Sequence, residues 1–192
     1  MTRIIVRDNK MKIRLTQDEV EMITDKAKEK SAKFTRIAPV NKSPYGFNHV
    51  HSHVVGLGAE YASHILFQEI EKMLCTNLFI EPSYADERRE GECDLYVGNL
   101  RVEVKGIKYK SWLRYGPCIS TRQLSKIQKT ADVVVWALYN ERCHEFTFIG
   151  FNDVSEISSI RPVLTGTEHK IENYPVRDIL KPLETMKFKV AV

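Results

Sequence analysis

The chain has 192 residues, of which 43% are hydrophobic, and a formal net charge of +4 at pH 7. This length suits one well-buried domain and is short for two. The longest apolar runs, such as 133–138, are far shorter than a membrane span, and the charged N-terminus lacks the pattern of a secretory signal. The four cysteines form no CxxC pair, which argues against a zinc knuckle and a disulfide framework. We therefore expect a cytoplasmic protein with no membrane partner.

Residues 1–48 are predicted to form an N-terminal extension. Residues 11–15 have the pattern of a short strand. Thr16 and Glu19 have the spacing of a capping box, which predicts a helix that ends near Lys33. Proline, serine, asparagine and glycine between Pro39 and Phe47 predict a loop.

A second helix is predicted from Gly58 to about Leu78, because apolar residues recur there at helical spacing. Glu60 then lies near its first turn, where the helix dipole alone favours an acid. Just before this helix, alternating residues predict one face of an extended strand with His49, His51 and His53 on it. Three histidines fanned along one strand do not close a tetrahedral zinc site without another element, so a structural or substrate-facing role is expected for them.

The segment 92–105 is predicted to be a β-hairpin that turns at Gly98 and Asn99, a dipeptide typical of two-residue turns. Residues opposite each other then have numbers that sum to 197, so Asp94 faces Glu103. Because side chains alternate along a strand, Asp94, Glu103 and Lys105 share one face. The other face is apolar and consists of Cys93, Leu95, Val97, Leu100, Val102 and Val104.

The two opposed carboxylates predict a site for a hard cation. Directly opposed positions have Cβ atoms about 4.5–5.5 Å apart, close enough for both acids to hold one ion. Without a cation the two acids repel each other. The plain alternative is a solvated ribbon in which Glu92 pairs with Lys105, but this alternative does not explain Asp94 opposite Glu103.

Basic residues concentrate in and after the hairpin. From Leu100 to Thr130 there are eight basic residues and one acid, a net charge of +7, which leaves −3 for the rest of the chain. A basic block beside paired carboxylates indicates a polyanionic substrate, and a solvated lysine-rich face is the alternative. Interleaved rings and cations in the polar connection 106–117 are typical of nucleic-acid contacts, although such rings also cover sheet edges. The candidate contacts there are Lys108, Lys110, Trp112 and Arg114.

A short helix is predicted from Ser120 or Thr121 to about Lys129, followed by a central apolar strand at 131–139 and a returning strand at 144–151. The order of helix, strand, strand, helix, strand, strand predicts an α/β core with a mixed sheet flanked by helices. Residues 49–152 are assigned to this core. Residues 153–192 are assigned to a C-terminal extension packed on it, with no predicted chemistry.

The residues Glu60, Asp94 and Glu103-Val104-Lys105 resemble the motif of the PD-(D/E)xK nuclease superfamily, which has the restriction-endonuclease-like fold. The resemblance covers about residues 56–152. It implies a core of helix, three strands, helix and strand, with the first strand around Leu78–Ser83. The phrase 56–62 is similar to the first-helix motif of small phage and bacterial members.

Two positions depart from the family pattern. Cys93 stands where the family has a proline, and Ile127 stands where exonuclease-type members have a tyrosine. The second departure argues against the recombination-exonuclease branch.

The resemblance implies a metal-dependent deoxyribonuclease, of endo or exo action, that uses Mg²⁺ or Mn²⁺. Asp94, Glu103 and the Val104 main-chain carbonyl would bind the metal through oxygen, which favours these ions over zinc. Glu60 would complete the cluster through a water or a second metal. Lys105 would orient the attacking water or stabilise the phosphate.

In the following helix, Gln123 matches a family position that contacts the metal-bound water or the scissile phosphate. Arg122 and Lys126 flank it as candidate phosphate contacts. DNA is the expected partner, and RNA stays open as a substrate. Two alternatives remain: a nucleic-acid-binding or assembly module of the same fold without catalysis, and a Holliday-junction resolvase, which would act as a symmetric homodimer.

Overall fold

The computed structural model describes residues 4–7, 10–37, 49–74, 80–82, 92–165 and 171–188. Its main sheet has seven strands in the order β1-β2-β8-β7-β5-β4-β3. The strands are β1 (Ile4–Arg7), β2 (Lys10–Arg14), β3 (Glu81–Pro82), β4 (Leu95–Val97), β5 (Leu100–Lys108), β7 (Val133–Asn140) and β8 (Glu145–Asp153). Within these ranges β5 and β7 are parallel, and the other neighbouring strands are antiparallel. The predicted α/β class with a mixed sheet is therefore confirmed.

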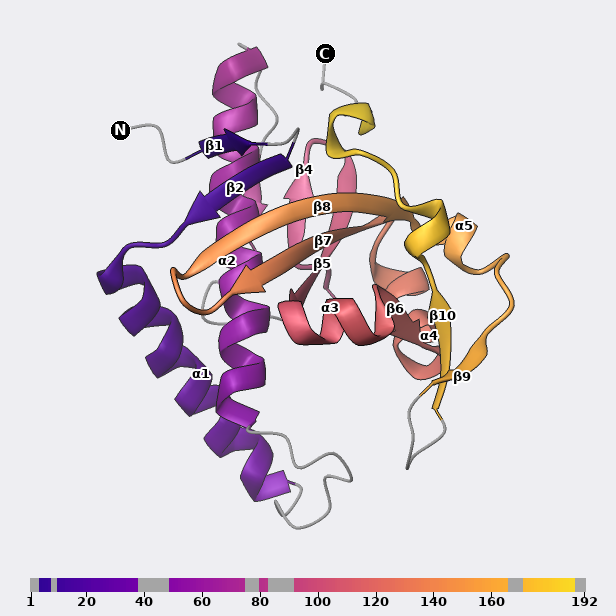
Figure 1. Cartoon of the computed structure of the whole chain (residues 1–192), viewed down its shortest axis with the longest axis horizontal. Coiled ribbons are helices and arrows are strands. Elements are labelled where there is room, and N and C mark those ends of the chain that lie inside the picture. The colour runs from indigo at the N-terminus through magenta and orange to yellow at the C-terminus, as the bar shows by residue number, and fades with distance from the viewer. Residues whose placement is uncertain are drawn as a thin grey trace.

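Helices cover both faces of the main sheet (Figure 1). On one face lie α1 (Gln17–Ile37) and α2 (His49–Leu74). On the other lies α4 (Thr121–Thr130), beside a small sheet of β6 (Cys118–Ser120), β10 (Ile171–Pro175) and β9 (Val163–Thr165). The short helices are α3 (Tyr109–Tyr115), α5 (Val154–Ile157), η2 (Arg177–Ile179) and η3 (Leu183–Thr185). None of the helices in the described ranges is long and apolar enough to cross a membrane.

Two hydrophobic clusters, one on each face, fix the positions of β5 and β7. The first joins α2 to the even-numbered residues of β5 and includes Val55, Ala59, Leu66, Val102, Val104 and Val135. The second joins α4 to the opposite face of β7 and includes Leu124, Ile127, Val134, Trp136 and Ile157. Since β7 is buried on both faces, its continuous apolar sequence fits the predicted central position.

The N-terminal strand and helix agree with the sequence pattern. Residues 10–14 form β2, and α1 begins after a capping box. Thr16 Oγ1 accepts a hydrogen bond from the Glu19 amide at 3.3 Å, and Glu19 Oε2 accepts one from the Thr16 amide at 2.8 Å. The helix continues to Ile37, past its predicted end near Lys33. The predicted loop at Pro39–Phe47 lies outside the described residues.

Helix α2 differs from its prediction. It begins at His49 rather than Gly58, so the extended strand predicted for His49, His51 and His53 is wrong. The alternation of the histidines is typical of a strand, and Gly56 and Gly58 suggest a break in a helix. Packing of Val55 and Ala59 against β5 nevertheless keeps this segment helical. Glu60 lies well inside α2 and not in its first turn, so the helix dipole does not account for it.

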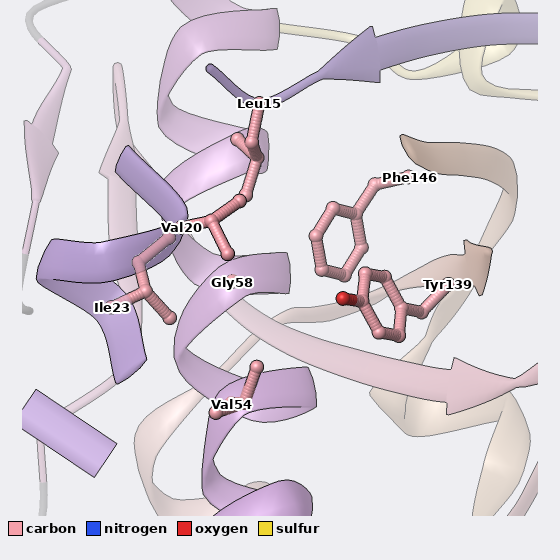
Figure 2. A pocket seen from close by; sticks show the side chains of 7 residues that line it. All are labelled: Leu15, Val20, Ile23, Val54, Gly58, Tyr139 and Phe146. Atoms are coloured by element: carbon pink, nitrogen blue, oxygen red, sulfur yellow. The ribbon is translucent and has the colours of Figure 1, made fainter. Parts of the chain in front are cut away.

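Gly58 lies where α2 packs against an aromatic ring of β8. A Cβ at Gly58 would lie 2.7 Å from Cζ of Phe146, so the missing side chain lets this ring pack against the helix. Around it, Leu15, Val20, Ile23, Val54 and Tyr139 line a cavity of about 10 Å³ (Figure 2). A cavity of this volume holds at most one water molecule, so it is a small gap in the packing and not a ligand site.

The C-terminal segment is fastened along β8. Phe151 and Lys181 exchange both backbone hydrogen bonds, at 2.9 and 2.8 Å. The buried Asn152 accepts a hydrogen bond from Trp136 Nε1 at 2.7 Å and donates one to the Ile179 carbonyl at 2.6 Å. Lys181 also forms ion pairs with Asp153 and Glu156. These contacts hold residues 177–186 against the core.

Arg101 and Asp132 join the beginnings of β5 and β7. The Arg101 guanidinium donates to Asp132 Oδ1 at 2.7 Å and to Oδ2 at 3.2 Å, and the Arg101 amide donates to Oδ2 at 2.9 Å. The same guanidinium reaches the carbonyl of Lys129 at the end of α4. These hydrogen bonds from Arg101 hold the pKa of Asp132 below its ordinary value, against the opposing effect of burial.

Asp132→Asn is expected to reduce the free energy of unfolding at neutral pH by about 1 kcal/mol or less, because both side chains are substantially exposed. The Asp132 pKa is lower in the folded chain than in the unfolded chain. Its stabilisation is therefore complete above the ordinary aspartate pKa and is lost as the pH falls through the lowered folded value. Urea unfolding of wild type and variant at several pH values measures this effect. Equal pH dependence for the two proteins would contradict it.

Candidate active site

The predicted hairpin register is confirmed for residues 95–97 and 100–102. Leu95 pairs with Val102, Tyr96 with Arg101 and Val97 with Leu100, so each pair sums to 197. The turn contains Gly98, whose φ of +59° favours glycine, and Asn99. Just before β4, the Asp94 amide donates to the Val102 carbonyl at 3.0 Å. These two numbers sum to 196, so the register of 197 does not extend to Asp94, and the predicted pairing of Asp94 with Glu103 stays a prediction.

Glu103 and Lys105 share the face of β5 that α4 covers. In the parallel pairing of β5 with β7, Glu103 lies beside Val134 and Lys105 beside Trp136, and these two β7 residues belong to the α4 cluster. Val102 and Val104 point to the opposite face, toward α2. The predicted separation of an acidic and an apolar face therefore holds along β5.

Cys93 does not follow the predicted alternation. It packs with Leu124 and Ile127 under α4, whereas Leu95 and Val97 pack under α2. Strand β4 begins only at Leu95, and Asp94 lies in a bend, so the alternation of a strand does not extend to Cys93. The prediction that Cys93 shares the face of Leu95 is wrong.

The Asp94 carboxylate is fixed against the backbone of β5. The side chain is 2% exposed, and its Oδ2 accepts a hydrogen bond from the Val104 amide at 2.7 Å. In an extended strand the N–H and C=O of one residue point toward the same neighbouring strand. The Val104 carbonyl therefore lies on the Asp94 side of β5, next to the carboxylate.

Lys105 partly balances the two acids. Its Nζ lies 2.5 Å from Oε1 of Glu103, a residue that is 9% exposed. A charge-assisted hydrogen bond of this kind is roughly twice as strong as a neutral one. Together with the Val104 amide at Asp94, it reduces the repulsion expected between the two carboxylates.

The donor set fits a magnesium ion held by few protein ligands. Mg²⁺ is typically bound through one or two carboxylates, with water and substrate phosphates completing the octahedron. Asp94 and Glu103 provide two such carboxylates. Among the described residues there is no group of three or more His, Cys, Asp or Glu side chains arranged to hold a metal. Glu60, Asp94 and Glu103 therefore do not form such a group, and a role for the buried Glu60 through a water stays a prediction.

Gln123 has a structural role in α4. Its amide donates to Ser120 Oγ at 3.2 Å, and its side-chain Oε1 accepts from the Ser120 amide at 3.3 Å, which completes a capping box. This role accounts for Gln123 without any substrate. Arg122 and Lys126 lie one turn apart on the exposed surface of the same helix, available to a phosphate backbone.

The predicted polar connection after β5 is instead helix α3, which starts directly at the end of the strand. Lys110 and Arg114 are exposed on it, and Trp112 is partly covered by Arg177, whose Cζ lies 4.9 Å from the ring centroid. Lys108 precedes the helix, and burial lowers the pKa of its amine despite the nearby Glu141. Sequence patterns gave no signal for Arg177, because the contact joins residues far apart in the chain.

No family model, curated protein or solved structure matches this chain.

Proposed function

We propose that this chain is a Mg²⁺-dependent deoxyribonuclease with a restriction-endonuclease-like core. The observation that carries the proposal is the hairpin, in which the Asp94 carboxylate accepts a hydrogen bond from the amide of Val104, the residue after Glu103, and Lys105 lies 2.5 Å from Glu103. Two acids and a lysine beside a strongly basic segment are suited to phosphodiester hydrolysis.

The order of elements supports the proposed core. Helix α2, strands β3, β4 and β5, helix α4 and strand β7 follow one another as helix, three strands, helix and strand. This is the order that the superfamily resemblance implies, with α3 and β6 inserted before α4. Strand β3 falls within the segment 78–83 expected to precede Asp94.

Each residue of the proposed site has a physical task. A bound Mg²⁺ would lower the pKa of a water and polarise a phosphate oxygen. Asp94 and Glu103 supply the carboxylate oxygens for it, and the Val104 amide holds Asp94 in place. Lys105, oriented by Glu103, presents an ammonium that neutralises charge developing on the phosphate. Arg122 and Lys126 contact the DNA backbone on the same side of the sheet.

A second candidate, a non-catalytic nucleic-acid-binding module on the same fold, is favoured by one observation. The Glu103–Lys105 ion pair satisfies both side chains without a metal. A site that never binds a cation would have this arrangement as its permanent state.

Cleavage assays decide between these candidates. The purified chain is incubated with linear, nicked, four-way-junction and single-stranded DNA, with Mg²⁺ or with EDTA, beside Asp94→Asn. We expect cleavage that requires Mg²⁺ and is lost in the variant. Cleavage by the variant at the wild-type rate would overturn the proposed site, and DNA binding without cleavage would establish the module. Preference for the junction by a dimeric protein would identify a resolvase.

A further inference from the structure

Helix α3 presents an unusual amount of apolar surface to solvent. None of its seven residues is buried. Tyr109 is 57% exposed, Leu113 65% and Tyr115 43%. Tyr109 and Leu113 are four residues apart and so lie on one side of the helix. A short helix that buries nothing contributes little to the core, so stability of the fold does not explain these rings.

The surroundings of these rings are cationic. Lys110 and Arg114, also four residues apart, form a second exposed row beside Tyr109 and Leu113. The Arg114 guanidinium lies over the ring of Tyr115, 5.1 Å from its centroid. In the sequence, no acid follows Glu103 until Asp132. This charge pattern is complementary to a polyanion and unfavourable for a cationic partner.

The C-terminal segment holds α3 in position. Arg177 stacks on Trp112 and donates from Nη2 to the Trp112 carbonyl at 3.1 Å. That carbonyl also accepts from the Gly116 amide at 2.9 Å, so Arg177 reinforces the end of the helix. The Val176 amide in turn donates to the carbonyl of Pro117 at 3.1 Å. The exposed rings are therefore displayed on a fixed helix and not on a free loop.

From these contacts we infer that α3 is a stacking platform for unpaired nucleotides of single-stranded DNA, with Tyr109 and Tyr115 as the stacking rings and Lys110 and Arg114 as the phosphate contacts. In a duplex the bases are stacked on one another and offer only their edges and the backbone. An exposed tyrosine ring gains a base to stack on only where the strand is unpaired. A helix of seven residues is about 10 Å long, whereas one turn of duplex DNA is about 34 Å long. The length of α3 therefore suits a few unpaired nucleotides.

The platform follows the strand that carries the proposed active site. Strand β5 carries Glu103 and Lys105 and runs into α3 without an intervening loop, so Tyr109 follows Lys105 by four residues. Along the extended strand, Tyr109 lies roughly 13 Å from Lys105 and roughly 20 Å from Glu103, so a bound strand of several nucleotides would span α3 and the carboxylates. The choice of DNA as the ligand rests on the proposed function, whereas the stacking geometry does not.

Binding is measured by fluorescence anisotropy in EDTA, so that no cleavage occurs, with labelled single-stranded DNA, the matching duplex and single-stranded RNA. We expect the single strand to bind at least tenfold more tightly than the duplex. Tyr109→Ala combined with Tyr115→Ala weakens the single-stranded complex roughly 5- to 150-fold, the loss of at least one stacked base, and changes duplex binding less than threefold. The matched Tyr→Phe pair keeps both rings and retains wild-type affinity.

The cations are tested through salt. Lys110→Gln with Arg114→Gln lowers the slope of log affinity against log salt by about 1.4 for the single strand, because two phosphate contacts are lost. The exposed Lys28 on α1, paired with Asp25, provides the control, and Lys28→Gln leaves the slope unchanged. Trp112 gives an independent signal, because the other tryptophan, Trp136, is buried and does not meet the DNA. Its emission is expected to change on addition of the single strand.

Several results would overturn the platform. These are equal affinity for single strand and duplex, undiminished binding by the double alanine variant, preference for RNA over DNA, or binding of anionic lipid vesicles in place of any oligonucleotide. The outcome is separable from the proposed function through Asp94→Asn. If this variant binds single-stranded DNA and the wild type does not cleave DNA, the nuclease proposal is wrong and the platform proposal holds. If the wild type cleaves DNA and the double alanine variant of Tyr109 and Tyr115 cleaves it equally well, the platform proposal is wrong and the nuclease proposal holds.

Discussion

Lys105→Met is expected to lower the rate of Mg²⁺-dependent DNA cleavage by roughly 10²- to 10³-fold, the typical cost of removing one preorganised group that stabilises transition-state charge. The concentration of Mg²⁺ that gives half the maximal rate is not expected to rise, because Lys105 is a cation competing for the Glu103 carboxylate. Glu103→Gln, in contrast, removes a ligand, so both the rate and the apparent affinity for Mg²⁺ fall. Initial rates across a Mg²⁺ titration distinguish the two roles.

The same substitution has a consequence for stability that activity does not report. Without Lys105, the largely buried Glu103 carboxylate loses its ionic partner, which costs about 1–3 kcal/mol. A cation bound at that carboxylate restores much of the loss, so the thermal midpoint of Lys105→Met is expected to rise with Mg²⁺ more than that of wild type.

Lys12 provides a closely matched control for both measurements. It lies on β2, its side chain is 24% exposed against 25% for Lys105, and it pairs with the buried Glu145 at 3.6 Å. Lys12→Met is expected to leave cleavage unchanged and to show no extra stabilisation by Mg²⁺. If Lys105→Met cleaved DNA as fast as Lys12→Met, the assignment of Lys105 to the reaction would be wrong.

The second large effect is expected at Gly106, where α2 crosses β5. A Cβ at this position would lie 2.5 Å from the Val55 carbonyl oxygen and 3.0 Å from the Ala59 Cβ. The first contact is with helix backbone, so a side-chain rotation does not relieve it. Gly106→Ala is therefore expected to cost about 1–3 kcal/mol or more, although alanine is ordinarily the better residue inside a strand.

Gly56 follows Val55 in α2, and no atom lies within 4 Å of the position that a Cβ on Gly56 would occupy. Gly56→Ala is expected to stabilise the chain by up to about 1 kcal/mol, the ordinary gain of alanine over glycine inside a helix. Differential scanning calorimetry of the two variants should give shifts of opposite sign, at roughly 2–4 °C per kcal/mol for a chain of this size. Destabilisation of similar size in both would show that close approach at Gly106 is not the cause.

The turn and the register of the hairpin were predictable because both depend on local pattern. The turn dipeptide fixes the register, so the pairing of residues 95–97 with residues 100–102 follows from their numbers alone. The capping box at Thr16 and Glu19 and the buried β7 are local in the same sense. Burial of Asp94, its hydrogen bond to Val104 and the pairing of Lys105 with Glu103 required the structure, because alternation gives a face and not a contact.

The remaining errors arise where tertiary contacts overrule local signals. The start of α2 has the alternation of a strand and two glycines, but packing of Val55 and Ala59 against β5 makes it a helix. Strands β6 and β9 have three residues each, too short for any period, and they are strands only because β10 pairs with both. Helix α3 buries no residue, so the hydrophobic pattern that normally identifies a helix is missing there.

The pairing of β2 with β8 bears on how the chain folds during its synthesis. Lys12 lies beside Thr147 and Arg14 beside Glu145, a residue 131 positions later, so one side of the main sheet joins segments far apart in the sequence. A nascent chain that has not yet reached Glu145 leaves β2 without this neighbour. Contacts of such long sequence separation make folding slow and keep strand edges exposed meanwhile. Strands β1 and β2 should therefore acquire protection from hydrogen exchange only after β8 has left the ribosome, late in translation.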